Sequence, residues 1–285
     1  MSIPRKHHYL PQSYLDRWAG PDAKVYSFVR PRGAGDKLDV KAHPVSAVAY
    51  QRDLYRLPEG GNERYQQRVE LEFLQRIDDR AAVALDKLDN GVPASLEDRV
   101  GLAQFLLSLL HRTPGRLQWL HNDLARRMAD VPNFDPVRDY DLVRRGMLDV
   151  FVDMVGSDQM VAMMYGMKVY RMEMGPSRFD LLTSDRPTML SNGLDEQDGF
   201  LMLPYSPRRI VILAHDKHVP DAFTHQDPDK LVRALNDAVV SQAEHVVIGR
   251  SAEQRRFIEN RFLFPTDPLK AHAGPDGIHR WEAPL

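Results

Sequence analysis

The spacing of apolar residues changes once along this chain, near residue 165, and this change predicts the fold class. Before it, apolar residues recur at steps of three and four, which is the period of helices that bury one face. After it, four segments read as short strands separated by turns: "GMKVYRMEMG", "RFDLLTS", "FLMLPYS" and "RRIVILAH". This order predicts an α+β fold, in which a helical middle region packs beside a mostly antiparallel β-sheet formed largely by the second half of the chain.

The helical middle region is expected to contain four helices. The first runs from about residue 63 to 89, and the second begins after Ser95 and ends at about His111. The second is apolar on most of its circumference, which predicts a central position in the core. Two further helices are expected near 115–130 and 136–165.

Shorter elements are expected around this centre. Pro11 begins a short helix, and "KVYSFVRP" and "LDVKAH" are interpreted as a pair of strands. A helix is expected over 227–244, followed by a strand in "HVVIGR" and a short helix in "AEQRRFIENRF". We expect one domain over residues 1–265 and a loosely packed tail over 266–285.

The composition excludes several kinds of chemistry. The 285 residues include no cysteine, which excludes disulfides, zinc–thiolate sites, iron–sulfur clusters and cysteine nucleophiles. A net charge of −2 gives no general attraction to nucleic acid or to an acidic membrane. Residues 1–12 lack the apolar core of a secretory signal, and no apolar run is long enough to span a bilayer. These features favour a cytoplasmic protein that does not enter the membrane.

Two adjacent histidines stand in an unusual segment, "RKHHYLPQSYLDRW". His7, His8 and Tyr9 are expected in an extended lead-in to the first helix, where neighbouring side chains point to opposite faces. An imidazole titrates near neutral pH and can act as acid, base or metal ligand. Two interpretations are open. Either the histidines have different roles at a site, or one packs under the helix while the other is solvated.

Glu70 is expected on the centre line of the apolar stripe of helix 63–89. At 100° per residue, Ile77, Ala81 and Leu88 lie within about 20° of its direction. A carboxylate that faces a core needs hydrogen-bond donors or has a raised pKa, which is typical of functional sites. The alternative is that Glu70 lies in the first turn, beyond the edge of the core, where it suits the helix dipole.

A polar line crosses the otherwise apolar second helix, formed by Gln104, Ser108 and His111. It is either the wall of a polar pocket or the one solvated face of the helix. Arg112 ends this helix. Its guanidinium could hold a carboxylate or phosphate with two hydrogen bonds, or it could neutralise the helix C-terminus.

Ser184 and Asp185 directly follow a predicted strand, where side chains are held firmly yet can reach a cleft. Asp185 could bind a metal or orient a histidine. The alternative is a turn in which both side chains bond to local backbone. Residues 215–218, "HDKH", are interpreted as a solvated loop, because their spacing matches no strong zinc motif.

The chain resembles a known family along most of its length. The opening "HHYLPQSYLDRW" is similar to the start of a large, mainly bacterial family of uncharacterised proteins, domain of unknown function 4238. Further segments resemble that family: "VELEFLQRIDDRAAVALDKL", "LAQFLLSLLHRTPGR", "LLTSDRPTML", "FLMLPYSPRRIVIL" and "LVRALNDAVVSQAEHVVIGR". The resemblance brings no established activity. It implies that the family's polar motif positions are held by His7, His8, Tyr9, Arg112, Ser184 and Asp185, and that either Glu70 or Glu72 is the counterpart of its acidic residue.

These residue types favour a hydrolase that cleaves phosphodiesters or nucleic acid, either by general acid–base catalysis or with the assistance of a divalent metal. His7 or His8 would be the base or a metal ligand, with Asp185 and Glu70 as ligands or orienting carboxylates. Arg112 would stabilise developing negative charge. Substrate contacts are assigned to Tyr9, Gln104 and Ser184. The net charge does not support nucleic acid as the substrate.

Two other hypotheses remain. In one, the protein is a binding or regulatory module whose polar motifs serve structure. In the other, a sensor uses the same pocket for a small ligand or nucleotide without turnover. Convergence of His7, His8, Arg112 and Asp185 on one cleft with Glu70 or Glu72 would favour the enzyme, and their separation would favour the structural interpretation.

Overall fold

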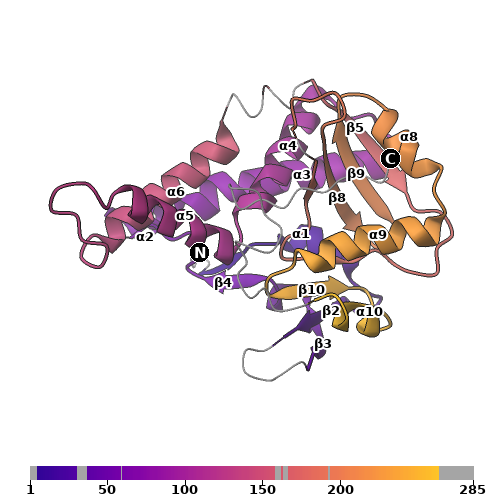
Figure 1. Ribbon diagram of the computed structural model, residues 1–285, viewed down its shortest axis with the longest axis horizontal. Helices are drawn as coiled ribbons and strands as arrows, with labels where there is room; N and C mark the ends of the chain where they lie inside the picture. Colours follow the sequence, from indigo (N-terminus) through magenta and orange to yellow (C-terminus); the bar gives the residue numbers. More distant parts are fainter. Residues whose placement is uncertain are drawn as a thin grey trace.

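A computed structural model describes residues 5–30, 37–58, 60–157, 162, 166–191 and 193–262 of the chain. Figure 1 shows the helices of residues 75–156 in the middle of the molecule and toward one end, and the strands of residues 200–214 toward the other. These helices are α3 (Gln75–Asp89), α4 (Leu96–His111), α5 (Pro114–Arg127) and α6 (Tyr140–Gly156). The predicted α+β class is confirmed. The predicted tail, 266–285, lies outside the described residues.

Local hydrogen bonds fix where the central helices begin. Ser95 caps α4 by accepting from the Asp98 backbone N–H, while the Asp98 carboxylate accepts from the Ser95 N–H at 2.9 Å. The Thr113 hydroxyl caps α5 by accepting from the Arg116 backbone N–H at 3.2 Å. Pro114 occupies the first turn, where the N–H that proline lacks would have no partner within the helix. The expected central position of α4 is confirmed, because most of its apolar side chains are buried.

The helix expected over 63–89 is three consecutive segments. These are α2 (Glu63–Gln66), the π-helical segment η3 (Val69–Leu74) and α3. A π-helical turn is wider than an α-helical turn, so the fixed step of 100° per residue does not hold across it. Glu70 lies within η3, and its direction therefore depends on this wider turn. π-helical segments are frequent at functional sites.

The described strands form three antiparallel sheets. The first pairs β1 (Lys6–His8) with β4 (Tyr50–Arg52), and the second has the order β3 (Asp39–Pro44), β2 (Lys24–Val29), β10 (Val246–Gly249) and β6 (Thr183–Ser184). The third has the order β5 (Lys168–Glu173), β9 (Arg209–Ala214), β8 (Phe200–Ser206) and β7 (Met189–Leu190). The third sheet is built entirely from the second half of the chain. The second sheet also includes the early hairpin β2–β3, because β2 pairs with the late strand β10.

The remaining helices are short except for one. They are α1 (Gln12–Leu15), η1 (Asp16–Trp18), η2 (Val45–Ala47), α8 (His218–Thr224), α9 (Pro228–Ser241) and α10 (Arg255–Glu259). Asp227 caps α9 by accepting from the Lys230 N–H at 3.0 Å. None of the helices in the described ranges is long and apolar enough to cross a membrane.

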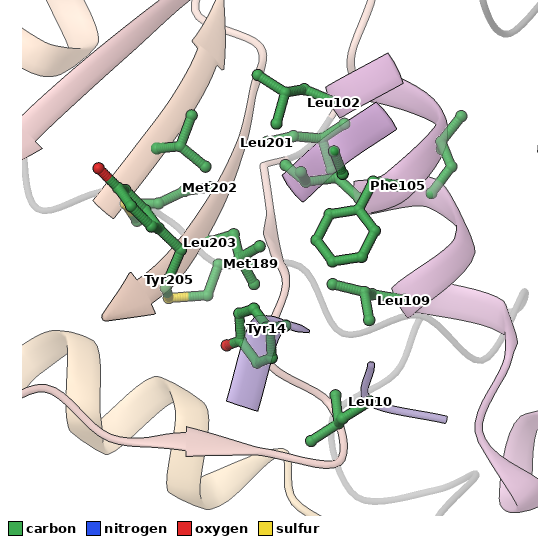
Figure 2. Close-up of a cluster of buried hydrophobic side chains, with 14 of the residues drawn as sticks. Leu10, Tyr14, Leu102, Phe105, Leu109, Met189, Leu201, Met202, Leu203 and Tyr205 are labelled. Atoms are coloured by element: carbon green, nitrogen blue, oxygen red, sulfur yellow. The ribbon is translucent and has the colours of Figure 1, made fainter. Parts of the chain in front are cut away.

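The N-terminal segment lies between the helices and the third sheet. Figure 2 shows Tyr14 of α1 between Phe105 of α4 and the side chains of β8. The Tyr14 hydroxyl bonds to the Thr183 hydroxyl at 2.6 Å and donates to the Pro204 carbonyl oxygen at 2.7 Å. These contacts join the N-terminal segment to the strands β6 and β8, and they hold the His-His-Tyr segment at this junction.

Candidate functional site

His7 has a structural position in the fold. It lies on β1, its side chain is fully buried, and its Nδ1 accepts from the Tyr55 backbone N–H at 2.9 Å. The imidazole stacks on the Tyr55 ring with a centroid distance of 5.5 Å. The Nδ1 atom of His7 is thus used in a hydrogen bond to the backbone, and this bond fixes the segment that carries Tyr55.

His8 points away from His7, as an extended segment requires. Its ring is half-buried against Tyr50, at a centroid distance of 5.6 Å. Burial lowers the pKa of His8, the positive charges of Lys6 and Arg112 lower it further, and a hydrogen bond with the Ser46 backbone opposes them. The imidazole is therefore neutral at pH 7. Its Nε2 has no hydrogen-bond partner among the described residues.

Arg112 is the centre of a buried cluster that we call the Arg112 cluster: Glu70, Asp78 and Arg112. The Arg112 side chain is 0% exposed. Its Nε donates to the Tyr9 carbonyl oxygen at 2.8 Å, and Nη1 donates to Asp78 Oδ1 at 2.8 Å. Its own carbonyl oxygen accepts from the Tyr55 hydroxyl at 2.8 Å. The guanidinium therefore joins the His-His-Tyr segment to α3 and α4, and it is enclosed by protein.

Glu70 adds a second carboxyl group to this cluster. Burial raises the pKa of Glu70 to about 7, the nearby Asp78 raises it too, and Arg112 lowers it. Burial also raises the pKa of Asp78, against the effect of Arg112. One guanidinium cannot neutralise two buried carboxylates, so the cluster favours a protonated Glu70 beside an Asp78–Arg112 ion pair. Glu72, the alternative counterpart, is exposed and lies 3.5 Å from Arg64.

Tyr9 connects the Arg112 cluster to a second group of polar residues. Its carbonyl oxygen bonds to Arg112, while its ring is buried within electrostatic reach of Asp185 and Glu244. Burial raises the pKa of the Tyr9 hydroxyl, and the two carboxylates raise it further. The hydroxyl thus stays protonated at neutral pH and is available as a hydrogen-bond donor.

Asp185 is fully buried and holds the turn between α9 and β10. Its two carboxylate oxygens accept from the backbone N–H groups of Glu244 at 3.0 Å and His245 at 2.7 Å. Burial and the neighbouring Glu244 raise the pKa of Asp185, whereas His245 and the two backbone donors lower it. The Ser184 side chain is also hydrogen-bonded to the backbone. Its hydroxyl donates to the Val239 carbonyl oxygen at 3.0 Å and accepts from the Arg186 N–H.

Glu244 is held between an arginine and a helix start. Its Oε1 accepts from Arg186 at 3.1 Å, and its carboxylate lies against Gly115 in the first turn of α5. The partial positive charge of a helix N-terminus favours a carboxylate there. Its Oε2 is buried with no hydrogen-bond partner in the described part of the chain.

Asp185, Glu244 and His245 together can supply metal ligands, and we call them the Asp185 cluster. Each offers one ligand atom, and the three atoms lie within 4.8 Å of one another. Asp185 is buried, Glu244 is half-buried and His245 is exposed, so the cluster opens to solvent on one side. Among the described residues, the metal ligands suggested by the sequence, His8, Glu70 and Asp185, do not form a group of this kind. Asp185 is grouped with Glu244 and His245 instead.

The polar line on α4 does not form a solvated face. Ser108 and His111 are buried, with the Ser108 hydroxyl donating to the Phe105 carbonyl oxygen at 2.7 Å and Arg116 Nε lying 3.4 Å from His111 Nδ1. The solvated alternative is thus wrong for these two residues, because each finds a partner within the core. Gln104, the third residue of the line, is half-buried.

Sequence reasoning missed Glu244, His245, Gly115 and Asp78. Glu244 and His245 lie between a helix and a strand, and polar residues at the end of an element are the signal that drew attention to Ser184 and Asp185. Gly115 follows Thr113-Pro114, and a glycine in the first turn of a helix signals a close approach. Asp78 had no distinguishing signal, because it lies among charged residues of a helix.

The chain belongs to the family described as Protein of unknown function (DUF4238), whose sequence model matches residues 6–253. The match includes both the Arg112 cluster and the Asp185 cluster. No curated protein and no solved structure matches the chain.

Proposed function

We propose that this protein is a metal-dependent hydrolase of phosphate esters, with the Asp185 cluster as its metal site. The observation that carries the proposal is the convergence of three ligand atoms, one each from Asp185, Glu244 and His245, within 4.8 Å. Two carboxylates and an imidazole suit Mn²⁺, Zn²⁺ or Mg²⁺. Such an ion would lower the pKa of a bound water and so provide a nucleophile at neutral pH.

The electrostatics of the cluster support a cation. Burial raises the pKa of Asp185, and the negative charge of the nearby Glu244 carboxylate raises it further. A cation would relieve this repulsion. The backbone donors to Asp185 leave lone pairs on both of its oxygens, and they fix the orientation of the carboxylate.

The surroundings supply groups for phosphate chemistry. Arg186 touches Glu244 and is placed to stabilise charge on a substrate oxygen. The protonated Tyr9 hydroxyl can donate a hydrogen bond to the same substrate. His8, the general base expected from the sequence, packs against Tyr50 and the Ser46 backbone, so it is not assigned to this site. Arg112, being enclosed, acts by positioning Tyr9 and does not touch the substrate.

The metal site is tested on the purified full chain after treatment with a chelator. We expect Mn²⁺ to raise the melting temperature of the wild type and to bind with micromolar affinity by calorimetry. Glu244→Gln and His245→Asn should lose both effects. His218, which is exposed at the start of α8, offers a matched control, and His218→Asn should respond as the wild type does.

Hydrolysis is measured on bis(p-nitrophenyl) phosphate with and without Mn²⁺. The proposal predicts turnover that requires the ion and falls at least a hundredfold in Glu244→Gln. Equal metal responses in all four proteins would show that the Asp185 cluster is not the metal site. Metal binding without turnover of any phosphate ester would contradict the hydrolase.

A second candidate function, a non-catalytic binding module, is favoured by one observation. His7, Arg112, Ser184 and Asp185 each direct polar atoms to backbone groups, as expected of motifs that stabilise a fold. In that case no metal shifts the melting temperature of the wild type, and both Asp185 cluster variants behave as the wild type does in the presence of Mn²⁺.

A further inference from the structure

A cavity of about 600 Å³ lies away from the Asp185 cluster, between α9, α10 and two turns of the β region. None of its lining residues belongs to the Asp185 cluster or to the Arg112 cluster. Its volume is typical of sites for small molecules and cofactors. We call it the arginine pocket, because arginine is its commonest lining residue.

The arginine pocket carries an excess of positive charge. It is lined by five arginines and only two acids, which are Asp180 and Glu253. The arginines come from separate parts of the chain: Arg178, Arg208, Arg233, Arg256 and Arg261. Like charges repel when they are brought together, and an anionic ligand would offset this cost.

Three of the five arginines are held in place by protein contacts. Arg208 is paired with Asp180 at 3.1 Å and donates to the Ser177 carbonyl oxygen at 2.8 Å. Arg178 is paired with Asp229 at 2.6 Å. Arg261 pairs with Asp237, and its guanidinium lies 3.9 Å from the centre of the Phe257 ring. These guanidinium groups are pre-positioned, which lowers the entropy cost of binding.

The other two arginines are available to a ligand. Arg233 on α9 and Arg256 on α10 are both exposed, and neither forms an ion pair with another described residue. A guanidinium binds phosphate oxygens through two parallel hydrogen bonds. Two such groups facing one cavity match a ligand with more than one phosphate group.

The back of the pocket is rigid. The Asn236 side chain is buried, and its Nδ2 donates to the Asp180 carbonyl oxygen at 2.9 Å and to Gln254 Oε1 at 3.1 Å. Gln254 in turn donates to the Asp180 carbonyl oxygen at 2.7 Å. This network ties α9, the segment before β6 and the residues before α10 together, so the lining arginines keep their relative positions.

We propose that the arginine pocket binds a small phosphorylated ligand of the size of a nucleoside diphosphate. The unpaired Arg233 and Arg256 would bind the phosphate groups. Phe179 and Phe257 line the same cavity and offer apolar surface to a base. Glu253 offers an acceptor for sugar hydroxyl groups, which a ligand of phosphate alone would not use.

The proposal is tested by calorimetry on the full chain in low salt with three probes: ADP, inorganic pyrophosphate and adenosine. ADP and pyrophosphate should bind to the wild type, with affinities that fall as salt is raised, and adenosine should not bind. The double variant Arg233→Gln/Arg256→Gln should bind ADP at least tenfold more weakly. Both side chains are exposed, so the variant should fold as the wild type does, with the melting temperature as the check.

Arg255→Gln is the matched control. Arg255 is the immediate neighbour of Arg256 on α10, is exposed and does not line the pocket, since it pairs with Glu259. Its ADP affinity should stay within twofold of the wild type. ADP that binds at least tenfold more tightly than pyrophosphate would establish that the base and sugar contribute, and equal affinities would support a ligand recognised through phosphate alone.

The proposal is overturned if neither ADP nor pyrophosphate binds at millimolar concentration, or if the double variant binds both as tightly as the wild type does. Binding of a single-stranded oligonucleotide with no binding of ADP or pyrophosphate would also overturn it, in favour of a nucleic-acid surface. These outcomes do not depend on metal or on turnover at the Asp185 cluster.

Discussion

The carboxylate of Glu244 occupies the space that a side chain at position 115 would fill. A Cβ atom built on Gly115 would lie 2.9 Å from the carboxylate carbon of Glu244 and closer still to one of its oxygens. Two residues far apart in the sequence are thus neighbours, and the glycine leaves room for the Glu244 carboxylate, which is the far end of a flexible side chain. This contact joins the start of α5 to the turn before β10.

Gly115→Ala is therefore expected to displace the Glu244 carboxylate and to reduce stability by about 1 kcal/mol, the low end of the cost of overpacking, because the overlapping atoms are the far end of a flexible side chain. The loss should be smaller when the same change is made in a Glu244→Ala background, where the overlap is absent. Urea denaturation of the four proteins measures this coupling. Gly156→Ala is a control at another helical glycine, where a Cβ meets only ordinary contact with Phe73, and it should not destabilise the protein. Equal costs of Gly115→Ala in both backgrounds would show that the contact is absent in solution.

Glu70 should make the stability of the protein depend on pH. Its folded pKa of about 7 lies above the ordinary value of 4.5, so the folded state binds more protons between these two values. The free energy of unfolding therefore falls as pH rises through this window. Glu70→Gln removes the effect, and its stability relative to the wild type should increase by about 2–3 kcal/mol between pH 5 and pH 8.

Glu72→Gln is the matched control for Glu70, since it lies in the same π-helical segment but is exposed. Its stability relative to the wild type should be nearly constant over the same pH range. A flat pH profile for Glu70→Gln as well would mean that Glu70 titrates normally and is not part of a buried cluster.

Arg112→Ala should be among the most destabilising single changes. It leaves Asp78 partly buried without its cation and the Tyr9 carbonyl oxygen without its donor, and removal of one partner of a buried pair typically costs about 3–5 kcal/mol. Adding Asp78→Ala should restore part of this loss, because the uncompensated charge is removed. Arg126→Ala breaks an exposed pair with Asp123, and its cost should stay below about 1 kcal/mol. A similar cost for the two arginines would argue against the Arg112 cluster.

Asp185→Asn tests whether Asp185 holds the turn before β10. An amide presents one acceptor oxygen in place of two, so one of the N–H groups of Glu244 and His245 loses its partner, at a cost of about 1–3 kcal/mol. Hydrogen exchange at residues 244 and 245 should accelerate more than exchange in α4. Unchanged exchange at these two amides would show that the carboxylate is not needed there.

The sequence alone determined the α+β class, the capped starts of α4 and α9, and the extended segment that separates His7 from His8. These features depend on local rules: periodicity, capping residues and the alternation of side chains along a strand. It also marked Arg112, Glu70 and Asp185 as unusual, because a polar residue at a buried position or an element end is visible in the pattern itself.

Only the tertiary structure decided which of these residues are neighbours. The hairpin β2–β3 joins β10, Asp78 meets Arg112 across two helices, and Glu244 meets Gly115. The sequence also did not predict that Asp185 lies close to Glu244 and His245. Local patterns carry no information on which distant segments pair, because pairing is settled by the burial and packing of the whole chain. The π-helical turn at Glu70 is a related case, since the sequence shows the period of a helix but not the wider turn that directs this carboxyl toward Arg112.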